Sequence, residues 1–151
     1  MIPASVQDLV TRWRLGFIAT VLPDGRPNVS PKGTFLILND RTLAFAEIRS
    51  PGTLAGIAHQ PEVEVSFVDA FVRKGARLRG PATVHPRGTG KFDALLPPFA
   101  AEWPTLLHRM NALVTIAVTE VRPLSTPPYD DGATEEDMIA LYRAKFGAMY
   151  P

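Results

Sequence analysis

The stretch from Thr34 to Ile48 constrains the fold of this chain more than any other feature. Residues 34–38 and 42–48 have the composition of two strands, and Asn39-Asp40 between them is a turn signal. Both strands are almost wholly apolar, whereas a strand with one solvated face alternates apolar and polar residues. We therefore expect a hairpin that is buried on both faces, either in a closed barrel core or under a subunit interface.

Two more strands are expected on the N-terminal side of this hairpin. They span Phe17 to Val21 and Arg26 to Lys32, and Pro23-Asp24-Gly25 forms the turn between them. The second strand contains two prolines, which cannot donate to a sheet ladder, so it should lie at an edge or contain a bulge. We place the bulge at Pro31-Lys32-Gly33, because bulges often re-aim a side chain next to a functional site.

The rest of the chain supplies further strands and several short helices. Strands are expected at Glu62 to Val68, at Arg77 to His85 with a break at Gly80-Pro81, and at Leu113 to Val121. Helices are expected after a Ser5–Asp8 capping box, after Ser50, within 91–96, within 99–110, and after a Thr134–Asp137 capping box.

These elements predict a mainly β fold with helices, of the α+β class. We expect a small β-barrel of about six or seven mostly antiparallel strands with short peripheral helices. A chain of 151 residues is most simply one domain. Its barrel core would span about 16–122 and a C-terminal arm and helix would span 123–151.

Composition excludes several classes of function. The net charge is +1, from 16 basic and 15 acidic residues, which argues against a nucleic-acid partner. Cysteine is absent, so there are no disulfides and no thiolate nucleophile. No apolar run is long enough to span a membrane, and the N-terminus has no secretory signal. We expect a cytoplasmic protein with no membrane partner.

Two polar motifs flank the hairpin, and its folding would bring them together. The first is Asn28-Val29-Ser30-Pro31-Lys32-Gly33 and the second is Arg49-Ser50-Pro51-Gly52-Thr53. Ser50 fits an N-cap and Pro51 a first helical residue, and helix starts bind anions. Lys32 and Arg49 suit a phosphate as a point charge and a planar fork. Judged on spacing alone, a plain helix cap with a solvated lysine remains the alternative.

Five motifs follow one another in order between Gly16 and Val84. They are Phe17-Ile18-Ala19-Thr20-Val21, then Asp24 to Gly33, then Leu43-Ala44-Phe45-Ala46, then Arg49 to Thr53, then Pro61-Glu62-Val63. In this order they resemble the flavin-binding split-barrel superfamily, the pyridoxamine 5'-phosphate oxidase-like proteins. The resemblance implies a split barrel that binds FMN at the interface of a homodimer.

The resemblance also implies which residues hold the cofactor. Asn28, Val29, Ser30 and Lys32 would contact the flavin and its ribityl-phosphate, and Ile48, Arg49 and Thr53 the phosphate end. The full expected set is Asn28, Val29, Ser30, Lys32, Gly33, Ile48, Arg49, Ser50, Thr53 and Leu54. The second subunit would add the strand end at Val68-Asp69 and the basic loop around Arg73, Lys74 and Arg77.

The sequence departs from the true oxidases after its last strand. These enzymes resemble one another in an Arg-x-His element that holds the substrate, and no such element is present here. We therefore do not expect oxidation of vitamin B6. No residue stands out as a catalytic acid or base, and no catalytic residue is named. The three histidines have no second ligand at metal-site spacing, so no metal is expected.

Several functions stay open at this stage. The first is an FMN-dependent oxidoreductase acting on a small organic substrate. The second is a non-catalytic flavin sensor or carrier, suggested by the missing substrate motif. The third is a reductase on the same fold that uses a deazaflavin (F420). The last is a dimeric barrel without a cofactor.

Overall fold

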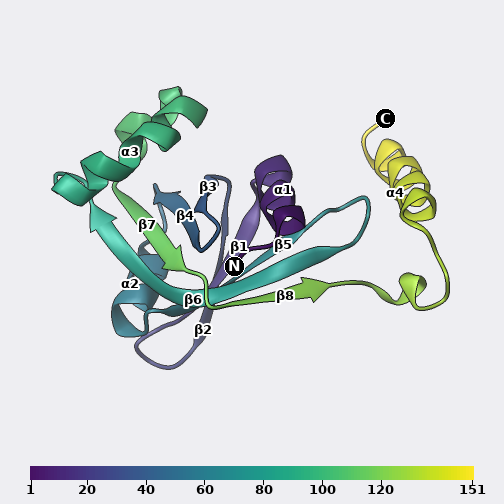
Figure 1. The fold of residues 1–151 in the computed structure, drawn as a ribbon, viewed down its shortest axis with the longest axis horizontal. Helices are drawn as coiled ribbons and strands as arrows, with labels where there is room; N and C mark the ends of the chain where they lie inside the picture. Colours follow the sequence, from purple (N-terminus) through teal and green to yellow (C-terminus); the bar gives the residue numbers. More distant parts are fainter.

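The computed structural model describes residues 1–151 as a curled antiparallel sheet with helices around it (Figure 1). None of its helices is both long and apolar enough to cross a bilayer. In chain order the elements are α1 (Ala4–Trp13), β1 (Gly16–Val21), β2 (Pro27–Lys32), β3 (Phe35–Asn39), β4 (Thr42–Glu47), α2 (Pro51–His59), β5 (Glu62–Val68), β6 (Gly75–Pro86), α3 (Gly90–Glu102), η1 (Pro104–Arg109), β7 (Ala112–Ala117), β8 (Glu120–Leu124), η2 (Pro127–Tyr129) and α4 (Glu135–Met149).

The strands form one half-barrel in the order β2-β1-β5-β6-β7-β4-β3, and β8 pairs with β6 outside this path. Every neighbouring pair is antiparallel. The expected α+β barrel class is therefore confirmed. β2 and β3 are consecutive in the chain but lie at the two ends of this order, so the short link 33–34 spans the split between the sheet edges.

The hairpin of β3 and β4 is buried on both faces, as its composition predicts. On one face Leu43 and Phe45 belong to the main core, which fills the inside of the half-barrel. On the other face Ala44 and Ala46 pack in a second core with Phe92 of α3. Within this chain, the outer face of the hairpin is thus covered by α3 and the segment that follows it.

β6 runs unbroken from Gly75 to Pro86, so the break expected at Gly80-Pro81 is wrong. At this point the strand exchanges partners, because residues up to Pro81 pair with β5 and residues from Ala82 pair with β7. The crossing is tight: a Cβ at Gly80 would overlap the carbonyl oxygen of Ala117. Glycine there marks a change of partner strand and not an end of the strand.

Three other local predictions are corrected by the structure. The register of β2 against β1 is regular through Lys32, so there is no bulge at Pro31-Lys32-Gly33, although β2 is an edge strand as its prolines predict. The irregularity lies in β3, between Ile37 and Asn39. The last strand divides into β7 and β8, which gives eight strands. α1 begins after Pro3 and has no side-chain cap.

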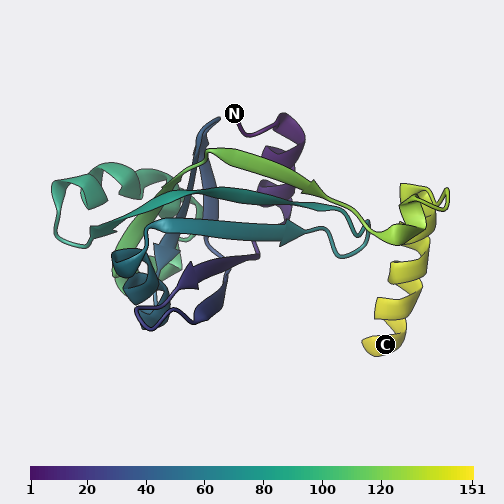
Figure 2. The ribbon, with the colours of Figure 1, turned by 90° about the horizontal axis from the view of Figure 1, so that it is seen from below.

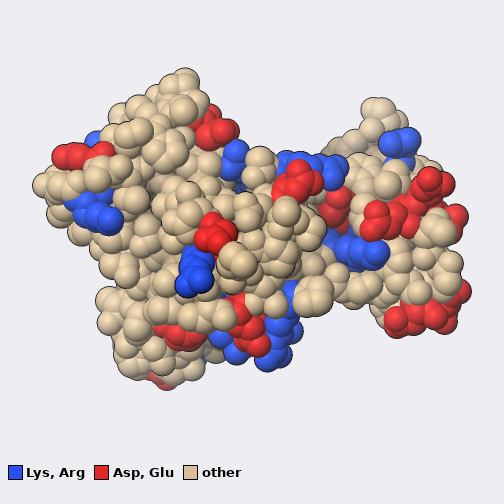
Figure 3. All heavy atoms as spheres, viewed as in Figure 1, with Lys and Arg blue, Asp and Glu red and all other residues tan.

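α4 lies beyond the far end of the sheet, at the end of the arm that follows β8 (Figures 1 and 2). Its predicted capping box is present: Thr134 Oγ1 accepts from the Asp137 amide at 3.1 Å, and Asp137 Oδ2 accepts from the Thr134 amide at 2.8 Å. The helix packs on the β5–β6 loop through Phe146, whose ring contacts Phe71 edge-on at 5.2 Å. Lys74 of this loop pairs with Glu135 at 3.0 Å, and several acidic side chains lie with basic ones on this end of the molecule (Figure 3).

Candidate functional site

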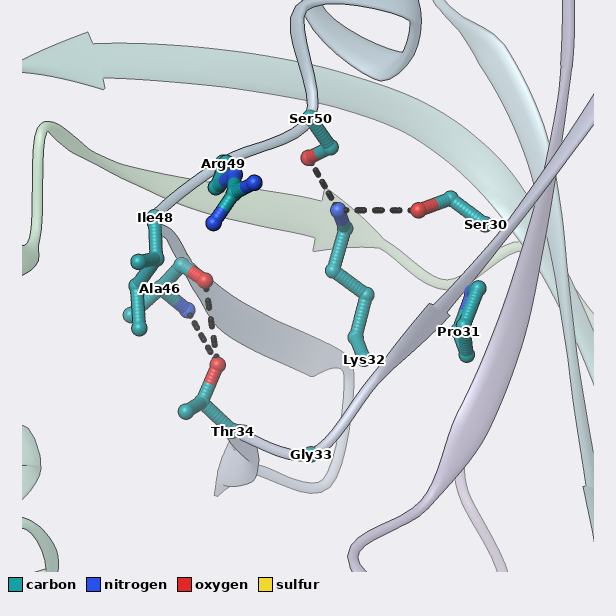
Figure 4. A pocket seen from close by; sticks show the side chains of 9 residues that line it. All are labelled: Ser30, Pro31, Lys32, Gly33, Thr34, Ala46, Ile48, Arg49 and Ser50. Atoms are coloured by element: carbon teal, nitrogen blue, oxygen red, sulfur yellow. Dashed lines mark hydrogen bonds between the residues drawn. The ribbon is translucent and has the colours of Figure 1, made fainter.

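A pocket of about 210 Å³ lies at the split of the barrel, where the two polar motifs meet (Figure 4). The end of β2 and the link to β3 form one wall, and the end of β4 and the segment before α2 form the other. Its lining residues are Ser30, Pro31, Lys32, Gly33, Thr34, Ala46, Ile48, Arg49 and Ser50. Six of the ten residues expected at the cofactor are in this list.

Lys32 reaches across the pocket from the last position of β2. The residue is only 8% exposed. Its amino group donates to Ser30 Oγ at 3.3 Å and to Ser50 Oγ. Burial lowers the pKa of Lys32 below its ordinary value of 10.5, and the nearby Glu47 carboxylate offsets part of this shift. Lys32 is therefore a partly desolvated cation and not the solvated charge of the alternative interpretation.

Ser50 precedes the first residue of α2, as predicted, but its hydroxyl does not cap the helix. It donates to Glu47 Oε1 at 2.6 Å and accepts from Lys32, so it stands between a carboxylate and an ammonium group. The backbone amide of Ser50 also donates to Glu47 Oε1. The hydroxyl points into the pocket and not toward the helix start, and its hydrogen bonds hold the Glu47 carboxylate and the Lys32 amino group in place.

Glu47 is a functional candidate that sequence reasoning missed. It is 3% exposed at the end of β4, and its carboxylate accepts hydrogen bonds from the lining residue Ser50. The sequence offers one indication, a single carboxylate that ends an otherwise apolar strand, three residues before the serine. Asn111 fixes the same segment from the start of β7, because its side chain donates to the Ile48 carbonyl at 2.9 Å. Arg49 is thus displayed from a segment that is held on both sides.

The start of α2 offers donors for an anion. Pro51 has no N–H, and the N–H of Gly52 makes no main-chain hydrogen bond. Thr53 is 1% exposed, and its hydroxyl has no partner. Helix starts attract negative charge through such free donors and the helix dipole. Two cations and two serine hydroxyls therefore line one small space, and the free donors of the helix start follow directly after it in the chain.

Four expected residues lie outside the pocket lining. Asn28 is on the same face of β2 as Ser30 and Lys32, but its side chain lies beside Gly52 and donates to Thr20 Oγ1 at 3.1 Å. Thr53 and Leu54 follow the helix start, and Leu54 packs against the main core. Val29 is 62% exposed on the outer face of β2. The period of two in a strand explains this split, because Ser30 and Lys32 share one face and Val29 takes the other.

The outer face of β1 and β2 is an exposed apolar surface next to the pocket. Phe17 and Val21 of β1 are exposed there together with Val29. The register places Phe17 opposite Pro31, and Val21 opposite Pro27, on neighbouring strands. Contiguous exposed apolar surface of this kind is typical of a protein contact.

None of the residues expected from a second subunit lines this pocket in the chain's own fold. Val68 is exposed at the end of β5. Asp69 is committed to its own loop, where it accepts from the amides of Phe71 and Val72 at 2.9 Å. Arg77 pairs with Glu64 at 3.5 Å on β5. Within one chain, therefore, these groups and the pocket do not form a single site.

The histidines form no metal site: no group of three or more His, Cys, Asp or Glu residues is close enough to hold an ion. His85 contacts Thr115 Oγ1 at 2.9 Å across β6 and β7. Burial, and secondarily the charge of Lys91, lower the pKa of His85 below its ordinary value of 6.5.

The half-barrel and its cation-lined pocket define a split-barrel protein. The family model described as pyridoxamine 5'-phosphate oxidase matches residues 2–126, and the chain belongs to this family. HupZ from Group A Streptococcus is 25% identical, with a TM-score of 0.72 over 83% of this chain and 96% of that chain. Comparison with curated proteins finds no match.

Two more distant structures show the same fold. An FMN-binding protein from Syntrophomonas wolfei subsp. wolfei is 13% identical, with a TM-score of 0.64 over 81% of this chain and 85% of that chain. An F420 reductase is 22% identical, with a TM-score of 0.62 over 80% of this chain and 98% of that chain.

Proposed function

We propose that residues 1–151 form one FMN-binding domain that works as a homodimeric oxidoreductase on a small organic substrate. The observation that carries the proposal is the convergence of Lys32, Arg49 and Ser50, the residue before α2, on one pocket in a member of this family. The cytoplasmic location expected from the sequence stays a prediction.

The residues present fit the phosphate end of FMN. Phosphate needs cations and N–H donors. The pocket supplies Lys32 and Arg49, and the free N–H of Gly52 lies at the helix start that follows the lining residue Ser50. A pocket of about 210 Å³ is smaller than the 300–1,000 Å³ range typical for whole ligands. The ring system would therefore lie outside it, on open surface that one subunit does not enclose. This supports a dimer in which the second subunit completes the site.

The exposed apolar face of β1 and β2 supports the same arrangement. Val29, Phe17 and Val21 lie beside the pocket and have no cover within the chain. A second subunit on this face would bury them and exclude water from the neighbouring flavin site.

In this proposal FMN, once bound, supplies the electron transfer, and the chain supplies binding and environment. Lys32 and Arg49 neutralise the phosphate, and Ser50 keeps the Lys32 amino group aimed at it. The Glu47 carboxylate partly compensates the positive charge of Lys32 when no anion is bound. The candidate set contains no group placed to act as a general acid or base on a substrate, so none is assigned.

Two other functions remain in the same site. An F420-dependent reductase is favoured by the structural likeness to an F420 reductase. A flavin sensor or carrier is favoured by the absence of a substrate-holding motif. Both keep the phosphate-binding role of Lys32 and Arg49, and they differ in the bound cofactor and in turnover.

The decisive experiment is identification of the ligand. Purified protein should be yellow, release FMN on denaturation, and rebind FMN one per chain. Release of F420 by mass spectrometry would select the reductase alternative. Bound FMN that nicotinamide donors cannot reduce, and that no acceptor reoxidises, would favour the sensor or carrier. Colourless protein that binds neither added FMN nor F420 would refute the cofactor site.

A further inference from the structure

A second cavity, of about 350 Å³, lies on the outer face of the sheet beside the first turns of α3. Its size is within the range of small-molecule sites. Strands β3, β4, β6 and β7 form its floor, and α3 forms one wall. We call it the α3 cavity. The polar residues that line it are Asn39, Thr42, Thr83, His85, Lys91 and Thr115.

The α3 cavity is separate from both parts of the proposed flavin site. It shares no lining residue with the pocket at Lys32. Thr42 is the first residue of β4, whereas Glu47, which binds Ser50 of that pocket, is the last. At about 3.4 Å per residue these two positions are roughly 17 Å apart along the strand. None of the residues expected from a second subunit at the flavin lines the α3 cavity either.

The floor of the α3 cavity carries hydroxyl groups at the point where the apolar cover of the sheet ends. Ala44 of β4 and Leu113 of β7 are buried in the second core with residues of α3. Two positions along the same strands, and on the same face, lie Thr42 and Thr115. Thr83 of β6 lies directly opposite Thr115. Because a hydroxyl both donates and accepts hydrogen bonds, this floor suits a ligand with several oxygen atoms.

The charge in the lining of the α3 cavity is positive. Lys91, the second residue of α3, takes part in none of the ion pairs of the structure. The dipole of α3 adds partial positive charge at this end of the helix. No carboxylate lines the cavity, and Asp93 of the same helical turn is not part of the lining. The half-buried His85 supplies a further polar group, since one of its ring nitrogens contacts Thr115. The lining therefore favours a ligand with one negative charge.

We propose that the α3 cavity is a binding site for a small aliphatic hydroxycarboxylate. Lys91 receives the carboxylate, and the threonine hydroxyls of the floor bind the hydroxyl groups of the ligand. Leu38 and Leu95 contact its carbon chain. No Phe, Tyr or Trp lines the cavity, so an aromatic ligand would find no ring to stack on. The site uses no residue of the proposed flavin site, and its test does not require bound flavin.

The probe for this proposal is D-gluconate, titrated into the full chain at constant pH and ionic strength. Sorbitol has the same hydroxylated chain without the carboxylate, and hexanoate keeps the carboxylate without the hydroxyls. Binding is followed by NMR of the histidine ring protons, and the signals of His85 are those lost in His85→Asn. We expect gluconate to shift the His85 signals saturably, to leave those of exposed His59 and His108 in place, and to bind more tightly than either analogue.

Three outcomes would overturn the proposal. The first is the absence of a saturable shift at His85, and the second is an equal shift of all the histidine signals. The third is an affinity for sorbitol or hexanoate that equals the affinity for gluconate, because the site would then not recognise the carboxylate and the hydroxyls together.

Two pairs of variants test the roles of the lining residues. Lys91→Met should weaken gluconate by about two- to fivefold, the range for an exposed charge contact, and leave sorbitol unchanged, whereas Lys91→Arg keeps the charge and the affinity. Thr83→Val should weaken gluconate by about two- to tenfold, the range for a neutral hydrogen bond, whereas Thr83→Ser keeps the hydroxyl and the affinity. Both residues are exposed, so the variants should fold, and circular dichroism checks this. Unchanged gluconate affinity in folded Lys91→Met or folded Thr83→Val would refute the site.

Discussion

Replacing Lys32 by methionine tests whether this residue binds the phosphate of FMN. A phosphate contact affects only the affinity for FMN, whereas a general change of the flavin site also affects the affinity for riboflavin. Methionine is nearly as long as lysine and unbranched, but it removes the charge, the bonds to Ser30 and Ser50, and the contact of Nζ with the Phe45 ring. A hydrogen bond to a charged group contributes roughly 1.5–3 kcal/mol. The Kd for FMN should therefore rise about 10- to 150-fold.

Riboflavin, which has the same ring system without the phosphate, provides the matched ligand. Quenching of flavin fluorescence measures both affinities on the same protein. The Kd for riboflavin should stay unchanged in Lys32→Met, and Lys91→Met, which removes an exposed lysine of α3, should change neither affinity. Equal weakening of FMN and riboflavin would show that Lys32 does not bind the phosphate, and unchanged FMN affinity would remove it from the site.

The stability of the free protein gives an independent measure of the same group. Because the pKa of Lys32 is lower in the folded state, the unfolded chain binds more protons as pH approaches 10.5 from below. The wild type should therefore gain stability as pH rises through this window, relative to Lys32→Met. The double variant Lys32→Met, Glu47→Gln should be at least as stable as wild type, since replacing a buried charged pair is often neutral or stabilising. The single variant should be less stable, because Glu47 is left without a countercharge.

Three further predictions concern packing, assembly and pH. Gly56→Ala should destabilise the fold by about 1–3 kcal/mol in chemical denaturation, because the new Cβ would lie 2.6 Å from Thr20 Oγ1; the matched Gly147→Ala, with free space, should be neutral or stabilising, and equal effects would refute the packing argument. Val29→Glu should give a monomer in sedimentation while Val29→Thr stays dimeric; a dimer in both would exclude the β1–β2 face. Since the folded pKa of His85 lies below 6.5, its contribution to stability should be lost as pH falls through that value, and His85→Asn should lose this pH dependence; an unchanged slope would contradict the assignment.

The sequence predicts those parts of the fold that depend on local chemistry. The apolar hairpin, the Ser50-Pro51 start of α2 and the Thr134 capping box depend on residues within a few positions of one another, and all three are present. The errors occur where a distant strand decides the outcome. Gly80-Pro81 interrupts nothing, because β7 takes over as the partner of β6 at that point.

The candidate site divides in the same way. The sequence predicts its cations and hydroxyls because they occur in two short motifs. Glu47 was missed because a buried acid gives no periodic signal, and its importance depends on the turn that brings Ser50 back onto it. The residues next to Ser50 in the sequence also do not predict its hydrogen bonds. Its hydroxyl donates to Glu47 and accepts from Lys32, and it therefore leaves the start of α2 uncapped.

The two prolines of β2 also govern how copies of this chain avoid one another. An edge strand exposes unpaired N–H and C=O groups that can recruit another strand, and this is a common route to aggregation. In β2 the backbone N–H is missing at Pro27 and Pro31. Proline in an edge strand places the side of the backbone that lacks the N–H toward solvent. A foreign strand aligned along β2 would find few donors, so fibril growth from this edge is disfavoured. The molecule thus keeps an apolar face available for specific association while its adjoining edge resists indiscriminate pairing.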